Sequence, residues 1–204
     1  MNREPFELLI ATNNPGKVKE LEQLLGKVPV VLRSLGDFTN VTEVEETGST
    51  FAENAILKAR GYALQTGMTA LADDSGLEIA ALNNAPGVLS ARYAGENADF
   101  DKKMSRLLLE MNEAVDRGRS AQFVCVMALA DASGEILFTA TGICKGNIAL
   151  GPRGSGGFGY DPIFMPIGYD RTFGELPDKI KHEISHRAKA SALIIRFLLD
   201  FIAI

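Results

Sequence analysis

A glycine-rich stretch, Gly154-Ser-Gly-Gly-Phe-Gly-Tyr-Asp-Pro162, constrains the fold of this chain more than any other segment. Four of its first six residues are glycine, which loses more backbone entropy on folding than any other residue. The stretch therefore has little propensity for helix or strand, and a compact protein seldom keeps such a segment for packing alone. It suits a backbone that approaches a ligand closely, with the rings of Phe158 and Tyr160 available to a flat partner.

The same stretch contains Gly154-x-Gly156-x-x-Gly159, the letters of the dinucleotide-binding fingerprint. A true fingerprint follows a strand and opens a helix. Here Pro152 and Arg153 precede the glycines and Pro162 follows them almost at once. The context therefore argues against a dinucleotide-binding fold.

The composition limits the class of protein. The chain has 204 residues, enough for one domain, and its hydrophobic content of 46% is ordinary for a globular protein with a real core. Its net charge of -5, from 21 basic and 26 acidic residues, argues against a general binder of the nucleic-acid backbone. A small phosphate compound held by a few lysines remains compatible with this charge.

Cysteines and terminal segments indicate the compartment. Cys125 and Cys144 are the only cysteines and lie in apolar stretches, so we predict two buried, reduced thiols. The first residues lack the apolar run of a signal peptide. The most apolar segment, 190–204, is too short to span a bilayer and carries Arg196 and Asp200. We therefore expect a cytoplasmic protein.

Helical and strand patterns alternate along the chain. Thr50 and Glu53 form a capping box at the start of one predicted helix, and Gly67 ends it. There is no repeat, low-complexity linker or clear domain boundary, and the interleaving predicts an α/β fold with a mixed sheet. The predicted strands are 6–11, 28–35, 68–72, 77–82, 122–130 and 135–146, and the predicted helices are 17–25, 50–66, 99–117 and 185 to near the end.

The segment Thr12-Asn-Asn-Pro-Gly-Lys17 joins the first predicted strand to a helix. Free backbone N–H groups and the helix dipole favour an anion at such a position, and Lys17 adds a positive charge. The segment is too short for a Walker-type phosphate loop. It also fits an ordinary strand–helix turn, so the two interpretations stay open.

Acidic residues gather in two short segments. Glu43, Glu45 and Glu46 crowd the first, and Asp73-Asp74-Ser75-Gly76 forms a good type I turn sequence between two predicted strands. Acid at a strand end lies where α/β proteins hold ligands, and two carboxylates from separate segments suit a hard cation such as Mg²⁺. A solvated acidic loop and a plain turn remain alternatives.

The letters His182-Glu-Ile-Ser-His186 match the zinc hydrolase pattern H-E-x-x-H. That pattern needs both histidines on one face of a continuous helix and a third ligand. These two histidines are the only ones in the chain, so the third ligand would be an acid. Ser185 is a plausible N-cap for the final helix, which would break the pattern.

Seven short motifs are distributed along essentially the whole chain: 11–17, 45–60, 72–77, 85–87, 90–93, 156–162 and 185–187. In this order they resemble the inosine triphosphate pyrophosphatase family, which hydrolyses non-standard purine nucleoside triphosphates. The least similar parts are 99–134 and 166–174. His182 matches no motif of that family, which further weakens the zinc interpretation.

The resemblance implies an elongated mixed sheet with flanking helices, forming two lobes around a central substrate groove within a single domain, 1–204. It implies a homodimer, a Mg²⁺ cofactor and no partner among nucleic-acid polymers or membranes. The implied reaction converts dITP, ITP or XTP to the nucleoside monophosphate and pyrophosphate. A pyrophosphatase for modified pyrimidine triphosphates and a non-catalytic sensor of purine nucleotides are the alternatives.

The resemblance also implies a role for each matching residue. Asp74 would accept the proton of the attacking water, and Glu45 and Asp74 would hold Mg²⁺. The triphosphate would be cradled by Thr12, Asn13, Asn14, Pro15, Gly16 and Lys17. Lys58 and Lys181 would add positive charge near the phosphates, and Ser75 would contact the substrate. The purine would be held by Phe158, Gly159, Tyr160, Asp161, His186 and Arg187.

Overall fold

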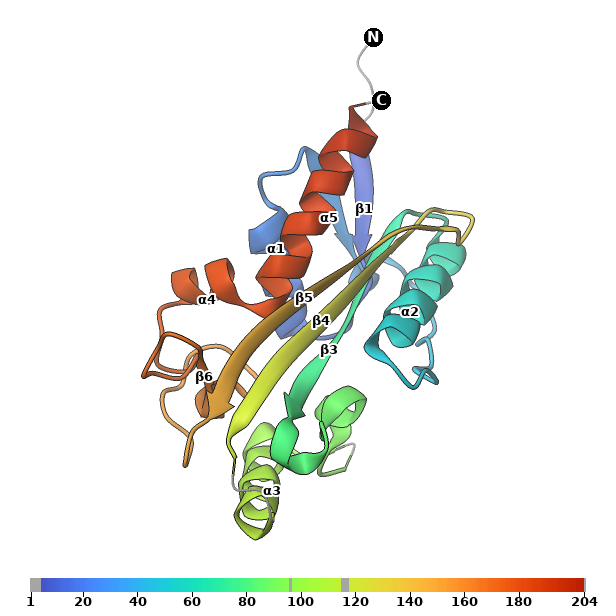
Figure 1. Ribbon diagram of the computed structural model, residues 1–204. Coiled ribbons are helices and arrows are strands. Elements are labelled where there is room, and N and C mark those ends of the chain that lie inside the picture. The colour runs from blue at the N-terminus through green and yellow to red at the C-terminus, as the bar shows by residue number, and fades with distance from the viewer. Residues whose placement is uncertain (1–4, 96, 115–117, 204) are drawn as a thin grey trace. The chain divides into compact units, whose positions relative to one another are not determined.

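The computed structural model describes residues 5–95, 97–114 and 118–203 (Figure 1). Six strands form one sheet in the order β2-β1-β3-β4-β5-β6. Strand β1 pairs in parallel with both β2 and β3, whereas β5 and β6 pair antiparallel, so the sheet is mixed, as predicted. The strands are β1(Phe6–Ile10), β2(Val30–Ser34), β3(Ala70–Ile79), β4(Ser120–Ala130), β5(Ile136–Ile148) and β6(Phe164–Pro166).

The structure contains five α-helices among its described residues. They are α1(Pro15–Leu25), α2(Phe51–Thr66), α3(Phe100–Glu113), α4(Asp178–Ile184) and α5(His186–Ile202). The capping box of α2 is confirmed, because the Thr50 side chain accepts from the Glu53 amide at 3.1 Å and Glu53 accepts from the Thr50 amide at 3.0 Å. Gly67 ends that helix in the left-handed conformation, as predicted.

The chain divides into two compact units. The first comprises the described parts of Met1–Asp74, Cys125–Gly142 and Ala188–Ile204, and the second comprises those of Ser75–Val124 and Ile143–Arg187. Each unit has its own hydrophobic core. Strands β3, β4 and β5 each contribute residues to both units.

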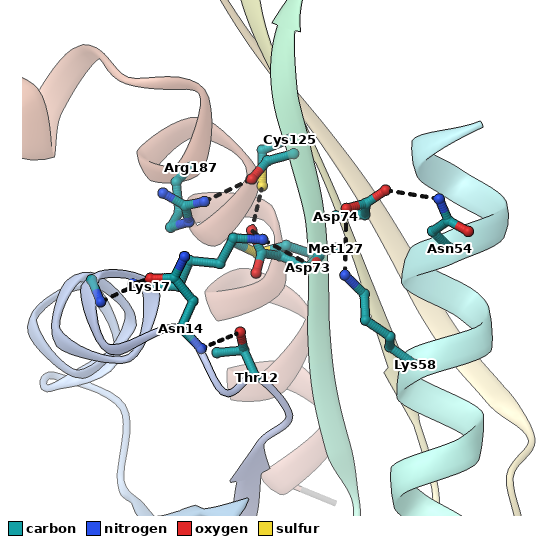
Figure 2. A network of polar contacts seen from close by, with 12 residues as sticks. Thr12, Asn14, Lys17, Asn54, Lys58, Asp73, Asp74, Cys125, Met127 and Arg187 are labelled. Atoms are coloured by element: carbon teal, nitrogen blue, oxygen red, sulfur yellow. Dashed lines mark hydrogen bonds and ion pairs between the residues drawn. The ribbon is translucent and has the colours of Figure 1, made fainter. Parts of the chain in front are cut away.

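In the first unit, helices cover both faces of the sheet. Leu21 and Leu25 of α1 and Ile194 and Leu198 of α5 share a buried cluster with Leu8 of β1. Helix α2 lies across β3 from α1 (Figure 2). Because both faces are covered, a polar side chain on β3 in this unit is enclosed whichever way it points.

The core of the second unit is rich in aromatic rings. The rings of Phe123 and Phe164 lie 4.5 Å apart between centroids, and Phe173 stacks on Phe164 at 5.6 Å. Met104 and Leu107 of α3 belong to the same buried cluster. These contacts anchor the segments that flank the glycine-rich stretch.

The predicted turn at residues 73–76 is wrong. Strand β3 runs unbroken from Ala70 to Ile79 and carries Asp73 and Asp74 in its interior, both less than 6% exposed. The turn preference of these residues is a local tendency, whereas both carboxylates find partners on helices packed against the strand. Tertiary contacts therefore override the local signal.

The hairpin of β4 and β5 was predicted, but β6 and α4 were not. Helix α4 ends at Ile184 with Ser185 as its C-cap, and the final helix starts at His186, in agreement with the predicted start near Ser185. The predicted C-terminal end of the helix 99–117 lies outside the described residues. Cys125 and Cys144 are buried and form no disulfide, as predicted. None of the described helices is long and apolar enough to cross a membrane.

Candidate functional site

The two adjacent aspartates of β3 point to opposite faces of the sheet (Figure 2). Successive side chains of a strand alternate between its faces, so neighbours in the sequence meet different partners. Asp73 meets Lys17 of α1, whereas Asp74 meets Lys58 and Asn54 of α2. One strand thus supplies a carboxylate to each of two helices.

Asp74 is enclosed by donors from α2. Its Oδ1 lies 3.4 Å from the Lys58 Nζ, and its Oδ2 accepts from the Asn54 side-chain nitrogen at 3.2 Å. Burial raises the pKa of Asp74 above its ordinary 3.8, and the ammonium of Lys58 opposes that rise without cancelling it. The carboxylate is therefore a stronger base than an exposed aspartate.

Lys58 bridges two carboxylates. Its Nζ lies 2.7 Å from Glu46 Oε1 as well as 3.4 Å from Asp74 Oδ1. Burial lowers the pKa of Lys58, but the nearby carboxylates, Asp74 first among them, outweigh burial and raise the pKa overall. Lys58 therefore stays protonated in its buried position and keeps a positive charge beside Asp74.

Glu46, rather than Glu45, is the glutamate that contacts Lys58. Glu45 is exposed, and Glu46 is half-buried. Sequence reasoning placed both in one acidic segment and did not assign Glu46 a partner. Asn54 was also missed, because an asparagine within a helix carries no obvious signal.

On the opposite face, Asp73 holds Lys17. The Nζ of Lys17 lies 3.2 Å from Asp73 Oδ2, and the Sγ of Cys125 donates to the same oxygen at 3.9 Å. Asp73 was not assigned a role from the sequence, because a turn was predicted where the side chains of a continuous strand in fact alternate between the two faces of the sheet. Recognising a continuous strand would have placed the two carboxylates on opposite faces.

The loop before α1 is already capped by its own side chain. Asn14 Oδ1 accepts from the amides of Gly16 at 2.9 Å and Lys17 at 3.2 Å, and the amide of Asn14 donates to the Thr12 hydroxyl at 3.2 Å. Pro15 has no N–H group. The predicted free amides are thus engaged in this structure, and an anion would have to replace the Asn14 side chain to use them.

In the second unit, Asp161 ties the glycine-rich stretch together. Its Oδ2 accepts from the Phe158 amide at 2.7 Å and from the Lys181 ammonium at 2.5 Å. Gly154 has a φ of +75°, and a Cβ there would overlap the carbonyl oxygen of Gly174. The glycines therefore allow another group to come close to this backbone, as the sequence suggested. At Gly154 that group is the protein's own backbone at Gly174.

Cations gather around the ring of Phe158. The Lys181 Nζ lies 4.5 Å from the ring centroid, and the Arg187 guanidinium carbon lies 5.7 Å from it. Arg187 is almost fully buried and donates to the Ser75 hydroxyl at 2.8 Å. Of the predicted base-binding residues, the structure therefore brings Phe158, Asp161 and Arg187 together, and it adds Lys181 to them.

Two further predicted residues have structural contacts in the second unit. The ring of His186 stacks on Phe123, with 4.7 Å between centroids. The Tyr160 hydroxyl donates to the Ser90 carbonyl oxygen at 2.9 Å, and burial is the main reason why the pKa of Tyr160 is raised. The hydroxyl of Tyr160 therefore ties the stretch to Ser90, whereas His186 packs into the aromatic core of the second unit.

The zinc interpretation fails on geometry. His182 lies in α4 and His186 begins α5, with the non-helical Ser185 between them, so the two are not on one continuous helix. Within residues 5–95, 97–114 and 118–203, no group of three or more His, Cys, Asp or Glu side chains could by itself hold a metal ion. The pattern H-E-x-x-H is accidental here.

A family model described as the Ham1 family matches residues 8–197, which is almost the whole chain. The chain belongs to the Ham1 family. Its sheet and helices also resemble solved Ham1 structures. A HAM1 protein from Coxiella burnetii superposes with a TM-score of 0.88 at 45% identity, over 96% of this chain and 99% of that one. The Ham1 protein of Staphylococcus aureus gives 0.83 at 41% identity, over 95% and 98%.

Ham1 relatives with assigned activities are similarly close. A dITP/XTP pyrophosphatase from Desulforamulus reducens is 50% identical over 185 residues, covering 91% of this chain and 92% of the relative. A protein of the same name from Coxiella burnetii is 47% identical over 91% of this chain and 92% of its own length.

Proposed function

We propose that this chain hydrolyses the non-standard purine nucleoside triphosphates dITP, ITP and XTP to the nucleoside monophosphate and pyrophosphate. The observation that carries the proposal is the buried carboxylate of Asp74, whose pKa is raised and which lies beside a charged lysine. Membership of the Ham1 family and the near-complete coverage by dITP/XTP pyrophosphatases support the substrate class.

Asp74 serves as the general base in this proposal. A base works best when its pKa approaches the working pH, and burial moves the pKa of Asp74 in that direction. The carboxylate accepts a proton from the water that attacks the triphosphate, and the pyrophosphate leaves. Asn54, which donates to Oδ2, fixes the orientation of the carboxylate.

Lysines neutralise the triphosphate. Lys58 stands beside Asp74, and Lys17 stands at the start of α1 on the other face of β3. A nucleophile approaches a polyanion only when part of its charge is offset, and fixed ammonium groups do this without reorganising. The Thr12 hydroxyl and the side chains of Asn13 and Asn14 lie in the loop that leads into α1, just ahead of Lys17, and complete the phosphate contacts in this proposal.

Magnesium is part of the proposal. Asp74 lies beside Lys58, and Glu45 is exposed on the segment whose next residue, Glu46, pairs with the same lysine. The carboxylate oxygens of Glu45 and Asp74 suit a hard cation, which binds proteins through one or two carboxylates and takes its other ligands from phosphates and water. Such a cation, bound with the nucleotide, offsets charge that develops on the phosphate oxygens. A site of this kind does not require three protein ligands.

The purine is read at the glycine-rich stretch. Phe158 offers a ring for stacking, and Lys181 and Arg187, both at that ring, are hydrogen-bond donors for a 6-oxo group. Lys181 therefore serves the base in this proposal, rather than the phosphates. Adenine carries an amino group at the same position, so it would present a donor to these cations instead of an acceptor, and mismatches of this kind discriminate by roughly 10⁴-fold.

A nucleotide panel tests the function. With Mg²⁺ present, the purified protein is expected to release pyrophosphate from dITP, ITP and XTP far faster than from dATP or dGTP. Release of single phosphates, or equal rates on ATP, would overturn the proposal. Turnover of modified pyrimidine triphosphates alone would favour that substrate class, and tight dITP binding without turnover would favour a sensor.

The cofactor, assembly and location have separate tests. Omission of Mg²⁺ from the assay and addition of a chelator are expected to abolish pyrophosphate release.

We also propose a homodimer in the cytoplasm, where nucleotide pools are kept. Light scattering coupled to size exclusion should give twice the chain mass of 22.0 kDa, and fractionation of the source cells should place the protein in the cytoplasmic fraction.

A further inference from the structure

The acidic segment, residues 42–49, lies along α2 in the antiparallel direction and has no regular structure of its own. At its start, the amide of Thr42 donates to Gln65 Oε1 at 2.7 Å, and Gln65 Nε2 donates back to the Thr42 carbonyl at 3.1 Å. At its end, the amide of Ser49 donates to Glu53 Oε2 at 2.7 Å. The segment is thus tied to the helix at both ends.

Between these ends, every second residue meets α2. The amide of Gly48 donates to Asn54 Oδ1 at 2.7 Å, and Glu46 meets Lys58 at 2.7 Å. The spacing of alternate residues in the segment is close to the spacing of turns in the helix, because two extended residues span about 6.6 Å and one helical turn rises 5.4 Å. Alternate residues therefore meet successive turns of one helix face.

Exposure along the segment follows the same alternation. Val44, Glu46 and Gly48 are half-buried, whereas Glu43, Glu45 and Thr47 are exposed. A slip of the segment by one residue would turn Glu46 outward and bring Glu45 or Thr47 against Lys58. The register of the segment on α2 therefore decides which side chain shares the Lys58 ammonium with Asp74.

Gly61 sets that register near the middle of the helix. A Cβ at Gly61 would lie 2.6 Å from Val44 Cγ2 and 3.1 Å from Val44 Cγ1, so the missing side chain forms a notch that the valine fills. One helical position further on, the Tyr62 hydroxyl accepts from the Val44 amide at 3.4 Å. Glycine disfavours the interior of a helix relative to alanine, and the contact with Val44 explains why glycine is nevertheless found at this position.

We propose that Gly61, with Gln65, is a positioning element for the pyrophosphatase reaction: it holds the acidic segment in register, so that Glu46 fixes the ammonium of Lys58 beside Asp74. This inference rests on the proposed function for its effect on catalysis. The register itself stands on the contacts within the first unit.

Gly61→Ala tests the register by filling the notch. The helix gains propensity, so the melting temperature is expected to hold or rise, while kcat on dITP falls at least tenfold and KM changes less than threefold. Amide hydrogen exchange is expected to quicken at least tenfold at Thr42 and Val44. A merely structural glycine would instead lower the melting temperature without separating kcat from KM.

Val44→Ala in the Gly61→Ala background provides the rescue. Removing the valine methyls makes room for the new Cβ, so both kcat and amide protection are expected to return toward the wild-type values. Leu64→Ala is the matched control, because Leu64 lies on the exposed side of the same helix and packs toward Gly134. It is expected to leave kcat and the exchange of residues 42–49 unchanged.

Three outcomes would overturn the inference: unchanged kcat and unchanged exchange in Gly61→Ala, no rescue by Val44→Ala, or an equal loss in Leu64→Ala. If Gly61→Ala does not fold, Gln65→Ala replaces it, since Gln65 is exposed and its loss frees only the Thr42 end. That variant is expected to quicken Thr42 exchange and lower kcat, and no change in either refutes the inference.

If the wild-type protein has no pyrophosphatase activity, the proposed function fails alone, and hydrogen exchange still decides the register.

Discussion

The ion pair between Asp161 and Lys181 is expected to stabilise the second unit far more than an ordinary surface pair. The two side chains are 2% and 5% exposed, and the Lys181 Nζ lies 2.5 Å from Asp161 Oδ2. Asp161→Asn keeps the shape and an acceptor oxygen but removes the charge. Breaking a buried pair from one side costs about 3–5 kcal/mol, and we expect about 3 kcal/mol because the hydrogen bonds can persist.

A loss of about 3 kcal/mol in a chain of this size corresponds to a fall of roughly 6–12 °C in melting temperature. Glu7→Gln is the matched control, because Glu7 pairs with Arg33 at a similar distance, 2.7 Å, while both side chains are more than 40% exposed. Exposed pairs contribute about 0–1 kcal/mol, so the control should fall by no more than about 4 °C.

Thermal and urea denaturation followed by circular dichroism measure both variants. The same carboxylate anchors the Phe158 amide, so the KM for dITP should also rise in Asp161→Asn. Equal melting temperatures for Asp161→Asn and Glu7→Gln would refute the reasoning from burial.

Three other changes test separate parts of the structure. Asp74→Asn should reduce pyrophosphate release by at least about 10²-fold and yet stabilise the fold at pH 7, as measured by urea unfolding. The sign follows from the pKa of Asp74, which folding raises above 3.8. The wild-type protein therefore loses stability as the pH rises through the folded pKa and Asp74 ionises, whereas the neutral asparagine does not. The stability difference between Asp74→Asn and the wild type should accordingly shrink toward pH 4. Gly154→Ala should cost about 1–3 kcal/mol more than Gly67→Ala, since both glycines have positive φ but a Cβ meets the Gly174 backbone only at the first; equal unfolding free energies would contradict this. Tyr160→Phe should lower the unfolding free energy by about 1–3 kcal/mol, because the Ser90 carbonyl oxygen loses the buried hydroxyl, and an unchanged urea midpoint would count against that hydrogen bond.

Much of the fold could be predicted from local patterns. The capping box at Thr50 and Glu53, the helix end at Gly67 and the hairpin around 131–134 are each specified by residues close together in the sequence. The missed strand β6 has three residues, too few to show alternation. Helix α4 has seven residues and no side-chain cap at its start, so it lacked a signal of its own.

The site was harder to predict because its geometry depends on tertiary contacts. The sequence Asp73-Asp74-Ser75-Gly76 favours a turn locally, and only the lysines of two separate helices make a strand the better solution. The partners of Glu46 and Asn54 are likewise set by the way the acidic segment lies on α2. Family motifs name residues, but they do not say which of two neighbouring glutamates faces inward.

The placement of two carboxylates at consecutive positions of β3 has an evolutionary consequence. Removing or adding one residue ahead of Asp73 within the strand would exchange the faces of Asp73 and Asp74, and so exchange the helices they serve. A change of two residues would preserve both partnerships. In functional descendants of this chain, length changes in the first half of β3 should therefore occur in even numbers or be absent altogether.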